Sequence, residues 1–276
     1  MVEARIAHGI AVAAARGGGQ DRARVFEADG GVTVVVADGA GGTGNGALAA
    51  QAIVDAVGVA AAEEVVATVG VVASHAGMDD VRVVASHAVL DAAGAVASQA
   101  VADTVGAVRN APRDWSALLF ELDRDAKRLG HGQSTAVVIS IRGGVLSGAS
   151  AGDSGAWLVQ NGDAIDLTEG QSRKPLVGAG CRPWHIPRQL LGDGTLLVAS
   201  DGLLHYAPRA AIIRLVSGED LPTAARALVD LVRLPSGGLQ DDVAVVLCRQ
   251  LRVRAASDDV QSAPEEDRDH RSPSRG

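Results

Sequence analysis

Residues 31–39 read Gly-Val-Thr-Val-Val-Val-Ala-Asp-Gly and carry the clearest structural signal in the chain. The run from Val32 to Ala37 is rich in β-branched residues, which favours a β-strand. It ends in Asp38-Gly39, a dipeptide that is common in turns. We therefore expect a strand that runs directly into a turn and leaves a carboxylate at its C-terminal end.

Two further predicted strands have aspartates at their ends. The strand expected over 195–199 runs into Asp201-Gly202, and the strand expected over 243–248 follows two aspartates, at 241 and 242. Each motif alone is an ordinary turn, but their joint occurrence is hard to attribute to chance. Antiparallel neighbours place the C-terminal end of one strand beside the N-terminal end of the next. We therefore expect Asp38, Asp201 and Asp241 to meet at one sheet edge, where Asp153 of a Gly-Asp-Ser turn could join them.

Carboxylates gathered in this way imply bound cations. They repel one another, and their pKa values rise unless a cation neutralises them. Oxygen ligands suit Mg²⁺ or Mn²⁺ better than zinc. Two such ions could bridge a hydroxide and clamp a phosphoryl group. Gly39 has no Cβ, so its backbone could approach a metal and offer its carbonyl.

The other elements predict the fold class. Strands are expected over 135–141, 145–151 and 156–160, with Asn161-Gly162 closing the last into a hairpin. Strands come in hairpins and helices in pairs, which is typical of an α+β fold with two antiparallel sheets covered by helices. Helices are expected over 45–57, 114–129 (with Asp114 as N-cap), 208–215 and 220–233.

Two segments differ from this pattern. Residues 58–110 are mostly Ala, Val and Gly and are interpreted as a helical insertion. The polar, charged stretch from about Arg252 predicts a disordered tail over 251–276. We expect residues 1–250 to form one domain that includes the insertion.

Composition narrows the function classes. The chain has 276 residues, a net charge of -8 and only 2% aromatic residues, so Val, Leu, Ile and Ala must fill the core. An acidic chain disfavours nucleic acid and anionic membranes as partners. The sequence contains no uninterrupted run of ~18 apolar residues, so we expect no membrane span. Cys181 and Cys248 are too far apart to suggest a disulfide framework and are expected to be buried in a cytoplasmic, monomeric protein.

Six short motifs, in order, complete the picture. They are Arg16-Gly-Gly-Gly-Gln20-Asp21, Val36-Ala-Asp38-Gly-Ala-Gly-Gly, Gln133-Ser-Thr135, Ala151-Gly-Asp153-Ser, Ala199-Ser-Asp201-Gly-Leu and Asp241-Asp242-Val-Ala-Val-Val. Their order and spacing resemble the Mg²⁺/Mn²⁺-dependent protein phosphatases, the protein phosphatase 2C-like (PPM-type) group, in a bacterial form. The resemblance spans roughly residues 5 to 250. It implies a four-layer α-β-β-α sandwich with the site in a cleft.

The resemblance also implies roles for individual residues. Asp38 would bridge two metals, with the Gly39 carbonyl on one of them. Asp201 and Asp241 would complete the other metal, and Asp153 would help hold a third, weaker one. The guanidinium of Arg16 would grip the substrate phosphate. Four further residues would surround these ligands and support them: Gln20, Asp21, Asp242 and His205. Asp21 would support the network of metal-bound water.

The sequence departs from the family pattern at several of these positions. Gln20 stands where the family has Glu, and Gly155 follows the Gly-Asp-Ser motif in place of Arg. His205 replaces an acid, and it is a poor Mg²⁺ ligand, so the third metal site is the one most affected. Asp242 stands in place of Asn. The carboxylates for the central pair of metals are all present.

The sequence therefore predicts a serine/threonine phosphoprotein phosphatase in which a hydroxide between two divalent metals attacks phosphorus, without a covalent phosphoenzyme. Its partners would be a phosphoprotein substrate and a cognate kinase. The alternative is a weak or inactive member of the same fold that binds phosphoproteins or regulates a kinase.

Two other motifs have weaker support. Gly39-Ala-Gly-Gly-Thr-Gly44 matches the dinucleotide fingerprint, but Asp38 would repel a pyrophosphate. Gly148-Ala-Ser150-Ala-Gly152 matches a hydrolase nucleophile elbow, but that elbow requires a helix to follow, whereas a strand is expected here.

Overall fold

The structure is a computed structural model that describes residues 5–28, 31–41, 45–75, 113–130, 132–218 and 220–251. Two five-stranded antiparallel sheets face each other, and a short pair of two-residue strands lies beside them. Sheet I has the order β1 (Arg5–Ala13), β12 (Val243–Leu251), β11 (Thr195–Ala199), β8 (Gly155–Gln160) and β9 (Asp163–Asp166). Sheet II has the order β10 (Trp184–Leu190), β7 (Val145–Ala151), β6 (Ala136–Arg142), β3 (Gly31–Ala37) and β2 (Arg22–Ala28). The short pair is β4 (Gly39–Ala40) with β5 (Gln133–Ser134).

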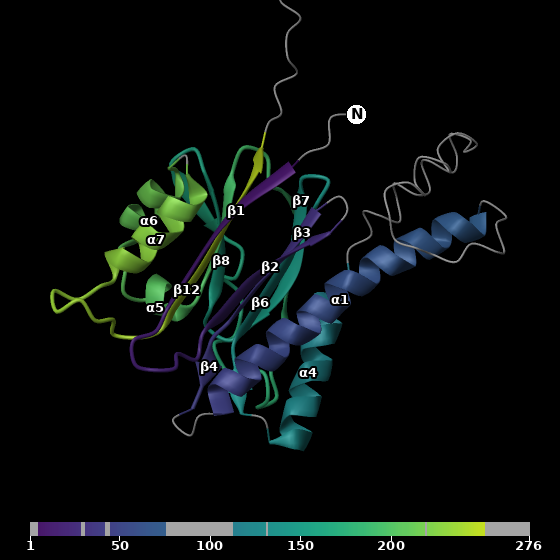
Figure 1. Ribbon diagram of the computed structural model, residues 1–276, viewed down its shortest axis with the longest axis horizontal. Helices are drawn as coiled ribbons and strands as arrows, with labels where there is room; N and C mark the ends of the chain where they lie inside the picture. The colour runs from purple at the N-terminus through teal and green to yellow at the C-terminus, as the bar shows by residue number, and fades with distance from the viewer. Residues whose placement is uncertain are drawn as a thin grey trace, which may run out of the picture.

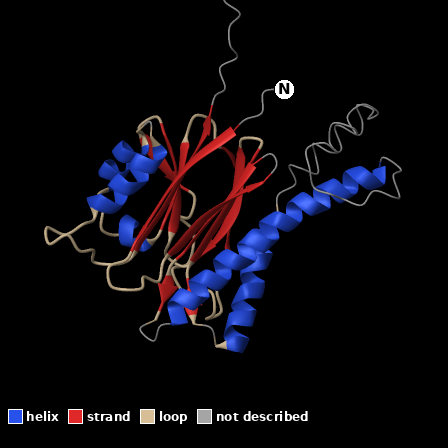
Figure 2. Cartoon of the chain, in the orientation of Figure 1, coloured by secondary structure: helices blue, strands red, loops and turns tan. Residues whose placement is uncertain are grey.

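Helices cover both outer faces of the sandwich (Figures 1 and 2). The helices α5 (Asp201–Leu204), α6 (Arg209–Val216) and α7 (Leu221–Leu231) lie on the side of sheet I. The helices α1 (Asn45–His75) and α4 (Trp115–Leu129) lie on the side of sheet II. The predicted four-layer α-β-β-α sandwich is therefore confirmed.

The strand β3 shows why its sequence has almost no polar residues. Val34 and Val36 pack between the two sheets, whereas Val35 and Ala37 face the layer of α1 and α4, and all four are fully buried. A strand buried on both faces needs apolar side chains at successive positions. The hydroxyl of Thr33 is paired inside the core, 2.9 Å from Ser140 Oγ.

Local capping explains where α4 begins. The carboxylate of Asp114 accepts a hydrogen bond from the backbone N–H of Ala117 at 3.1 Å, so Asp114 is the predicted N-cap. The helix ends at Gly130, whose φ of 67° is left-handed. The predicted hairpin at Asn161-Gly162 is present between β8 and β9.

The first helix is longer than predicted. We expected it to end at Val57, but α1 continues to His75, because the Ala- and Val-rich stretch that follows Val57 contains no proline to end the helix. The first part of the predicted insertion, 58–75, is thus a continuation of a helix that packs on sheet II. Residues 76–110 of that insertion and the tail from Arg252 onward lie outside the described residues.

The edge strand β10 and the helix α5 are among the elements that had no clear sequence signal. The edge strand β10 contains Pro187 and a register shift between Ile186 and Gln189, and most of its side chains are exposed, so it lacks an apolar alternation. The helix α5 is a single turn that starts at Asp201, within the motif that we interpreted as a turn.

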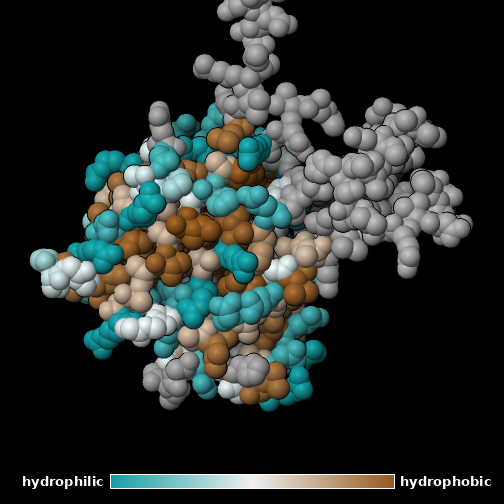
Figure 3. Space-filling view, in the orientation of Figure 1, coloured by the Kyte–Doolittle hydropathy of each residue, from teal (hydrophilic) through white to brown (hydrophobic). Residues whose placement is uncertain are grey.

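The apolar start of α1 meets the length and composition of a membrane-spanning helix over Asn45–Ala62, and 44% of this window is buried within the structure. Ala50, Ile53, Val54 and Val57 pack there against sheet II, as expected of a core helix. The absence of a membrane span stays a prediction. On the face drawn in Figure 3, hydrophobic residues gather over the strands, with hydrophilic residues around them.

Candidate functional site

Four strand ends of sheet I meet at one end of the sandwich. The register pairs Ala13 with Val243, and it pairs Ala199 with both Val245 and Gly155. The chain therefore leaves β1 and β11, and enters β12 and β8, at the same end of the sheet. This arrangement places the Arg16 loop and the aspartates at 153, 201, 241 and 242 around one end.

Sheet II contributes to the same end. Arg22 pairs with Ala37, and Ala136 pairs with Ala151, so β2 and β6 begin where β3 and β7 end. Asp21 precedes β2, and Asp38 follows β3. The turn with Asp153 connects the end of β7 to the start of β8, so the two sheets present these strand ends together. The acids thus come from both sheets, which corrects the expectation of a single sheet edge.

A cleft of about 800 Å³ lies at this end of the sandwich. Its lining includes five aspartates from four distant parts of the chain, namely Asp38, Asp153, Asp201, Asp241 and Asp242. Arg16, Gln20 and Gly39 line it as well. Of the predicted site residues, only Asp21 and His205 are not in the lining. Asp21 is buried beneath it, whereas His205 is exposed and packs edge-to-face on Tyr206, with ring centroids 4.9 Å apart.

The backbone of Asp38 is held on both sides by residues 134 and 135. The N–H of Asp38 donates to Thr135 Oγ1 at 3.0 Å, and its carbonyl accepts from Thr135 N at 2.8 Å and from Ser134 Oγ at 2.9 Å. Thr135 Oγ1 also lies 2.6 Å from the buried hydroxyl of Ser154. These contacts fix the end of β3 and connect it to the turn that carries Asp153.

Two glycines allow close backbone approaches at the cleft. A Cβ on Gly39 would lie 2.3 Å from the carbonyl oxygen of Gly46, so this glycine lets the first turn of α1 approach the end of β3. A Cβ on Gly202 would lie 1.9 Å from the carbonyl oxygen of Asp242. In both Asp-Gly motifs the glycine is therefore required by close packing. Neither glycine has a left-handed backbone conformation.

The clustered acids raise one another's pKa values. Burial, followed by the charges of Asp21 and Asp201, raises the pKa of Asp38 to about 10. Burial also raises the pKa of Asp21 to about 6, although contacts with Ser200 and Asp38 oppose this shift. The pKa of Asp201 is raised by burial and by Asp153, and His205 opposes the increase. Without a counter-charge, this cluster strongly disfavours the ionised carboxylates.

The donor set fits divalent cations of the Mg²⁺ or Mn²⁺ kind. All the cleft carboxylates offer oxygen ligands, and both oxygens of the buried Asp21 side chain lack a well-formed hydrogen bond to any described residue. Within the described ranges, however, no group of three or more acidic, histidine or cysteine side chains is placed to hold a metal ion. The predicted ligands thus share a cleft without forming a preassembled metal site in the described part of the chain.

Two cationic side chains line the cleft beside these acids. Arg16 lies exposed on the loop after β1, and Lys174 lies exposed on the segment between β9 and β10. Neither side chain forms an ion pair or a hydrogen bond within the part of the chain that the structure describes. Sequence reasoning missed Lys174, because its distance along the chain from every motif gives no signal that it joins this cleft.

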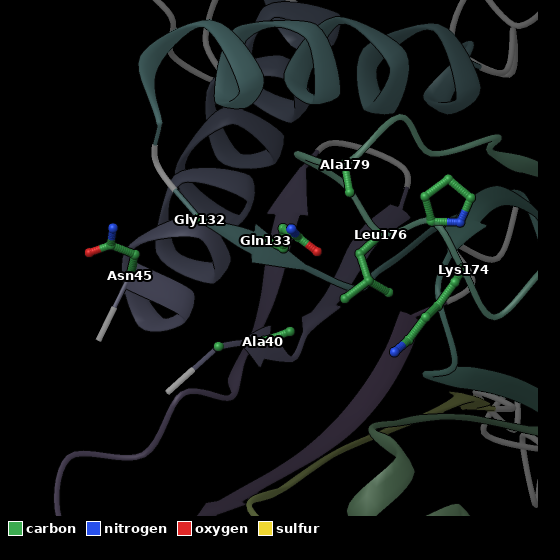
Figure 4. A pocket seen from close by; sticks show the side chains of 9 residues that line it. Ala40, Asn45, Gly132, Gln133, Lys174, Leu176 and Ala179 are labelled. Carbon is green, nitrogen blue, oxygen red and sulfur yellow. The ribbon is translucent and has the colours of Figure 1, made fainter. Parts of the chain in front are cut away.

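A second pocket of about 650 Å³ adjoins the cleft and shares Ala40, Gly41, Lys174 and Leu176 with it. Figure 4 shows the Lys174 side chain extending into this opening, on the same side as Leu176. The lining of this second pocket contains the amides of Asn45 and Gln133 and no acidic residue. Positive charge is therefore available at the rim of an otherwise acidic cleft.

The serines near the cleft are committed to structural contacts. Ser134, Ser154 and Ser200 are fully buried. Ser200 Oγ accepts from the N–H of Ala244 at 2.9 Å, which ties the end of β11 to the start of β12. Ser150, the serine of the hydrolase-like motif, is fully buried in β7 and is followed by a turn and another strand. No nucleophile elbow is therefore formed.

Comparisons with known proteins identify the fold. No protein-family model matches the sequence, and no curated protein matches it at a significant level. Among solved structures, the serine/threonine phosphatase of S. agalactiae is 17% identical to this chain. The match covers 89% of this chain and 99% of the S. agalactiae chain, with a TM-score of 0.58. The catalytic domain of the phosphatase PstP, solved with two manganese ions, is 18% identical, covers 89% and 98%, and has a TM-score of 0.57.

A third similar structure is PppA, a key regulatory component of T6SS in Pseudomonas aeruginosa. It is 20% identical, covers 90% of this chain and 98% of its own, and has a TM-score of 0.56. The chain therefore has the fold of these bacterial serine/threonine phosphatases, which are of the PPM type. At these identities the comparison establishes the fold alone.

Proposed function

We propose that this chain is a PPM-type, metal-dependent phosphatase that hydrolyses phosphoserine and phosphothreonine in proteins. The observation that carries the proposal is the one cleft to which both sheets bring five aspartates and Arg16, whose side chain has no ion-pair partner among the described residues. Mutually repelling, partly buried carboxylates are costly for a fold, and bound cations would offset that cost. The shared fold with bacterial phosphatases supports the same conclusion.

Each residue then has a definite task. Asp38, Asp201 and Asp241, with the carbonyl of Gly39, would hold two divalent cations, and Asp153 would contribute to a third. When bound, these cations supply Lewis acidity and activate water for attack on phosphorus. The buried carboxylate of Asp21, which lacks a well-formed hydrogen bond, would orient water beneath the cleft. Gln20, whose amide donates to the Gly41 carbonyl at 3.2 Å, fixes the wall of the cleft beside Asp38.

The phosphate group is recognised by Arg16 in this proposal. A guanidinium offers paired N–H donors that match phosphate oxygens and stabilise their charge during transfer. Arg16 is exposed at the mouth of the cleft and carries no competing carboxylate contact among the described residues. Ser134, Ser154 and Ser200 are buried and already hydrogen-bonded, so water attacks phosphorus directly and no phosphoenzyme forms.

The substrate is a phosphorylated protein segment, because the cleft is open and its rim carries Arg16 and Lys174. The partner that produces this substrate would be a serine/threonine kinase. We propose that the enzyme acts in the cytoplasm as a monomer.

A second candidate is a phosphoprotein-binding module of the same fold without turnover. Two observations favour it: the amide of Gln20 supplies no charge where the related enzymes have an acid, and the described residues form no preassembled metal-binding group. Such a module would use Arg16 to bind a phosphate without cleaving it.

The two candidates are separated by hydrolysis of p-nitrophenyl phosphate by the full-length chain, with and without Mn²⁺. Enzyme function predicts Mn²⁺-dependent turnover that falls about 100-fold or more in Asp38→Ala and in Asp241→Ala. Asp230→Ala removes an exposed acid of α7 that pairs with Arg233 at 2.8 Å, and this control should retain full activity. If the folded wild-type chain binds a phosphopeptide but shows no turnover with Mn²⁺, the binding module is the correct function.

A further inference from the structure

The loop that carries Arg16 is held at both ends by one carboxylate. Asp242 Oδ1 accepts a hydrogen bond from the backbone N–H of Ala15 at 2.7 Å, and Asp242 Oδ2 accepts a short hydrogen bond from the backbone N–H of Gln20. Asp242 is 227 residues from Ala15 along the chain. The carboxylate thus closes residues 15–20 into a loop with Arg16 near one end.

Apart from Asp242, the side-chain hydrogen bonds that hold this loop among the described residues lie at its C-terminal end: Arg22 Nη1 donates to the Gly19 carbonyl at 2.9 Å, and the Gln20 amide donates to the Gly41 carbonyl at 3.2 Å. Residues 17–19 are three consecutive glycines, and a Cβ on Gly17 or Gly18 would meet nothing within 4 Å. Glycine loses more backbone freedom on ordering than any other residue, so the loop has a strong tendency to be mobile. Its one internal backbone hydrogen bond, from Gly19 N–H to the Arg16 carbonyl, is long at 3.4 Å.

Asp242 is itself firmly placed. Its backbone N–H donates to Asp241 Oδ1 at 2.9 Å, and it immediately precedes β12 in the middle of the strand ends that form the cleft. Its carbonyl oxygen lies against Gly202 at the start of α5. The residue therefore connects the proposed cation ligands directly to the loop that carries the proposed phosphate ligand.

An aspartate is chemically suited to this connection, and an asparagine is not. Two backbone N–H donors require two acceptor oxygens. An asparagine offers one oxygen and an NH₂ group, so one of the two N–H groups would face another donor. Asp242 is also the position at which the sequence departs from the Asp-Asn pattern of the related phosphatases.

We infer that Asp242 is the positioning residue for Arg16: its carboxylate fixes both ends of the 15–20 loop and so presets the guanidinium for the phosphate. The kinetic consequence rests on the proposed phosphatase function, whereas the ordering of the loop does not. Without the two hydrogen bonds that Asp242 accepts, which we call the clamp, the loop is no longer preorganised. Arg16 must then be ordered each time a substrate binds.

The sign of the effect on KM distinguishes this role from a purely electrostatic one. A carboxylate in the cleft repels a phosphate dianion, so removing its charge alone would strengthen substrate binding and lower the KM. Removing the clamp frees Arg16 and raises the KM. Asp242→Asn keeps the size of the side chain, which limits other structural effects.

The ordering of the loop is tested by amide hydrogen exchange on the full-length, metal-free chain. We expect the amides of Ala15 and Gln20 to exchange about tenfold faster or more in Asp242→Asn than in the wild type. The matched control is Asp220→Asn, the same chemical change at the N-cap of α7, where Asp220 accepts from Thr223 N–H at 2.8 Å. Unchanged exchange of the two loop amides in Asp242→Asn would overturn the inference, whatever the activity of the protein.

The kinetic test is a double-mutant cycle with p-nitrophenyl phosphate and saturating Mn²⁺. Asp242→Asn should raise the KM about tenfold with a smaller effect on kcat, and it should have no further effect in an Arg16→Ala background. A lowered KM, or effects of the two substitutions that simply add, contradicts action through Arg16. A wild-type chain without turnover would refute the phosphatase proposal alone, because the exchange experiment still decides whether Asp242 holds the loop.

Discussion

Asp38 and Thr135, 97 residues apart in the chain, exchange two hydrogen bonds: Asp38 N–H donates to Thr135 Oγ1 at 3.0 Å, and Thr135 N–H donates to the Asp38 carbonyl at 2.8 Å. This reciprocal pair joins the end of β3 to the start of β6. The side chain of Asp38 lines the cleft, and its backbone is held in place by Thr135, the residue that precedes β6. The position of the central acid is thus set in part by the buried hydroxyl of Thr135.

Replacing Thr135 with Val should impair the site more than the fold. The substitution keeps the shape of the side chain but leaves the Asp38 N–H and the Ser154 hydroxyl without their partner, at a cost of about 1–3 kcal/mol of unfolding free energy. We expect kcat/KM with Mn²⁺ to fall about tenfold or more, because the backbone of Asp38, the proposed metal ligand, loosens.

The matched control for Thr135→Val is Thr33→Val, which removes a buried hydroxyl bonded to Ser140 in the same sheet, away from the cleft. It should reduce the free energy of unfolding by a comparable amount and leave kcat/KM unchanged. Equal activity losses in the two variants would show that Thr135 has only a general structural role.

Asp123 should make stability depend on pH in the acid range. Burial alone would raise the pKa of Asp123, but hydrogen bonds from the backbone N–H groups of Cys181, Gly180 and Gly178, together with the charge of Lys127, lower it overall. The three N–H distances are 3.0, 2.7 and 2.9 Å. A carboxyl group whose folded pKa is depressed stabilises the fold above its unfolded pKa, and this contribution is lost as the pH falls through the folded value.

Asp123→Asn should therefore reduce the free energy of unfolding at pH 7 by about 1–3 kcal/mol. The difference from the wild type should shrink as the pH drops below the unfolded value of about 4. Urea unfolding between pH 7 and pH 3 measures both effects. A difference that stays constant or grows toward low pH would mean that the ionised carboxylate does not anchor residues 178–181 to α4.

Gly202→Ala should distort the cleft by steric overlap. The added methyl group would lie 1.9 Å from the Asp242 carbonyl oxygen, so α5 and the start of β12 would have to separate. We expect a loss of about 1–3 kcal/mol in unfolding free energy, together with weaker Mn²⁺ activation. Gly17→Ala, where an added Cβ meets nothing within 4 Å, serves as the control for stability. A Gly202→Ala protein as stable as Gly17→Ala would contradict the close approach.

The sequence predicted the fold where its signals are local. The apolar run before Asp38 and the Asp114 cap identified β3 and α4, because strand burial and capping depend on neighbouring residues. The end of α1 and the strand β10 were not predicted, since the former lacks a stop signal and the latter is exposed and interrupted by Pro187.

The site was predictable only in part. Aspartates at strand ends are visible in the sequence, but their meeting at one end of both sheets depends on strand order and register. The double contact of Asp242 with the Arg16 loop and the entry of Lys174 into the cleft join segments far apart in the chain. No local pattern encodes either contact, so they required the structure.

The central claim is that the cleft holds paired divalent cations. Anomalous diffraction at the manganese edge, from crystals of the full-length chain soaked in Mn²⁺, tests it most directly. The account predicts two anomalous peaks in the cleft beside Asp38, within reach of Asp201 and Asp241, and their loss in Asp38→Ala. A fully soaked crystal with no peak in this cleft, or with peaks only at other surfaces, would contradict it.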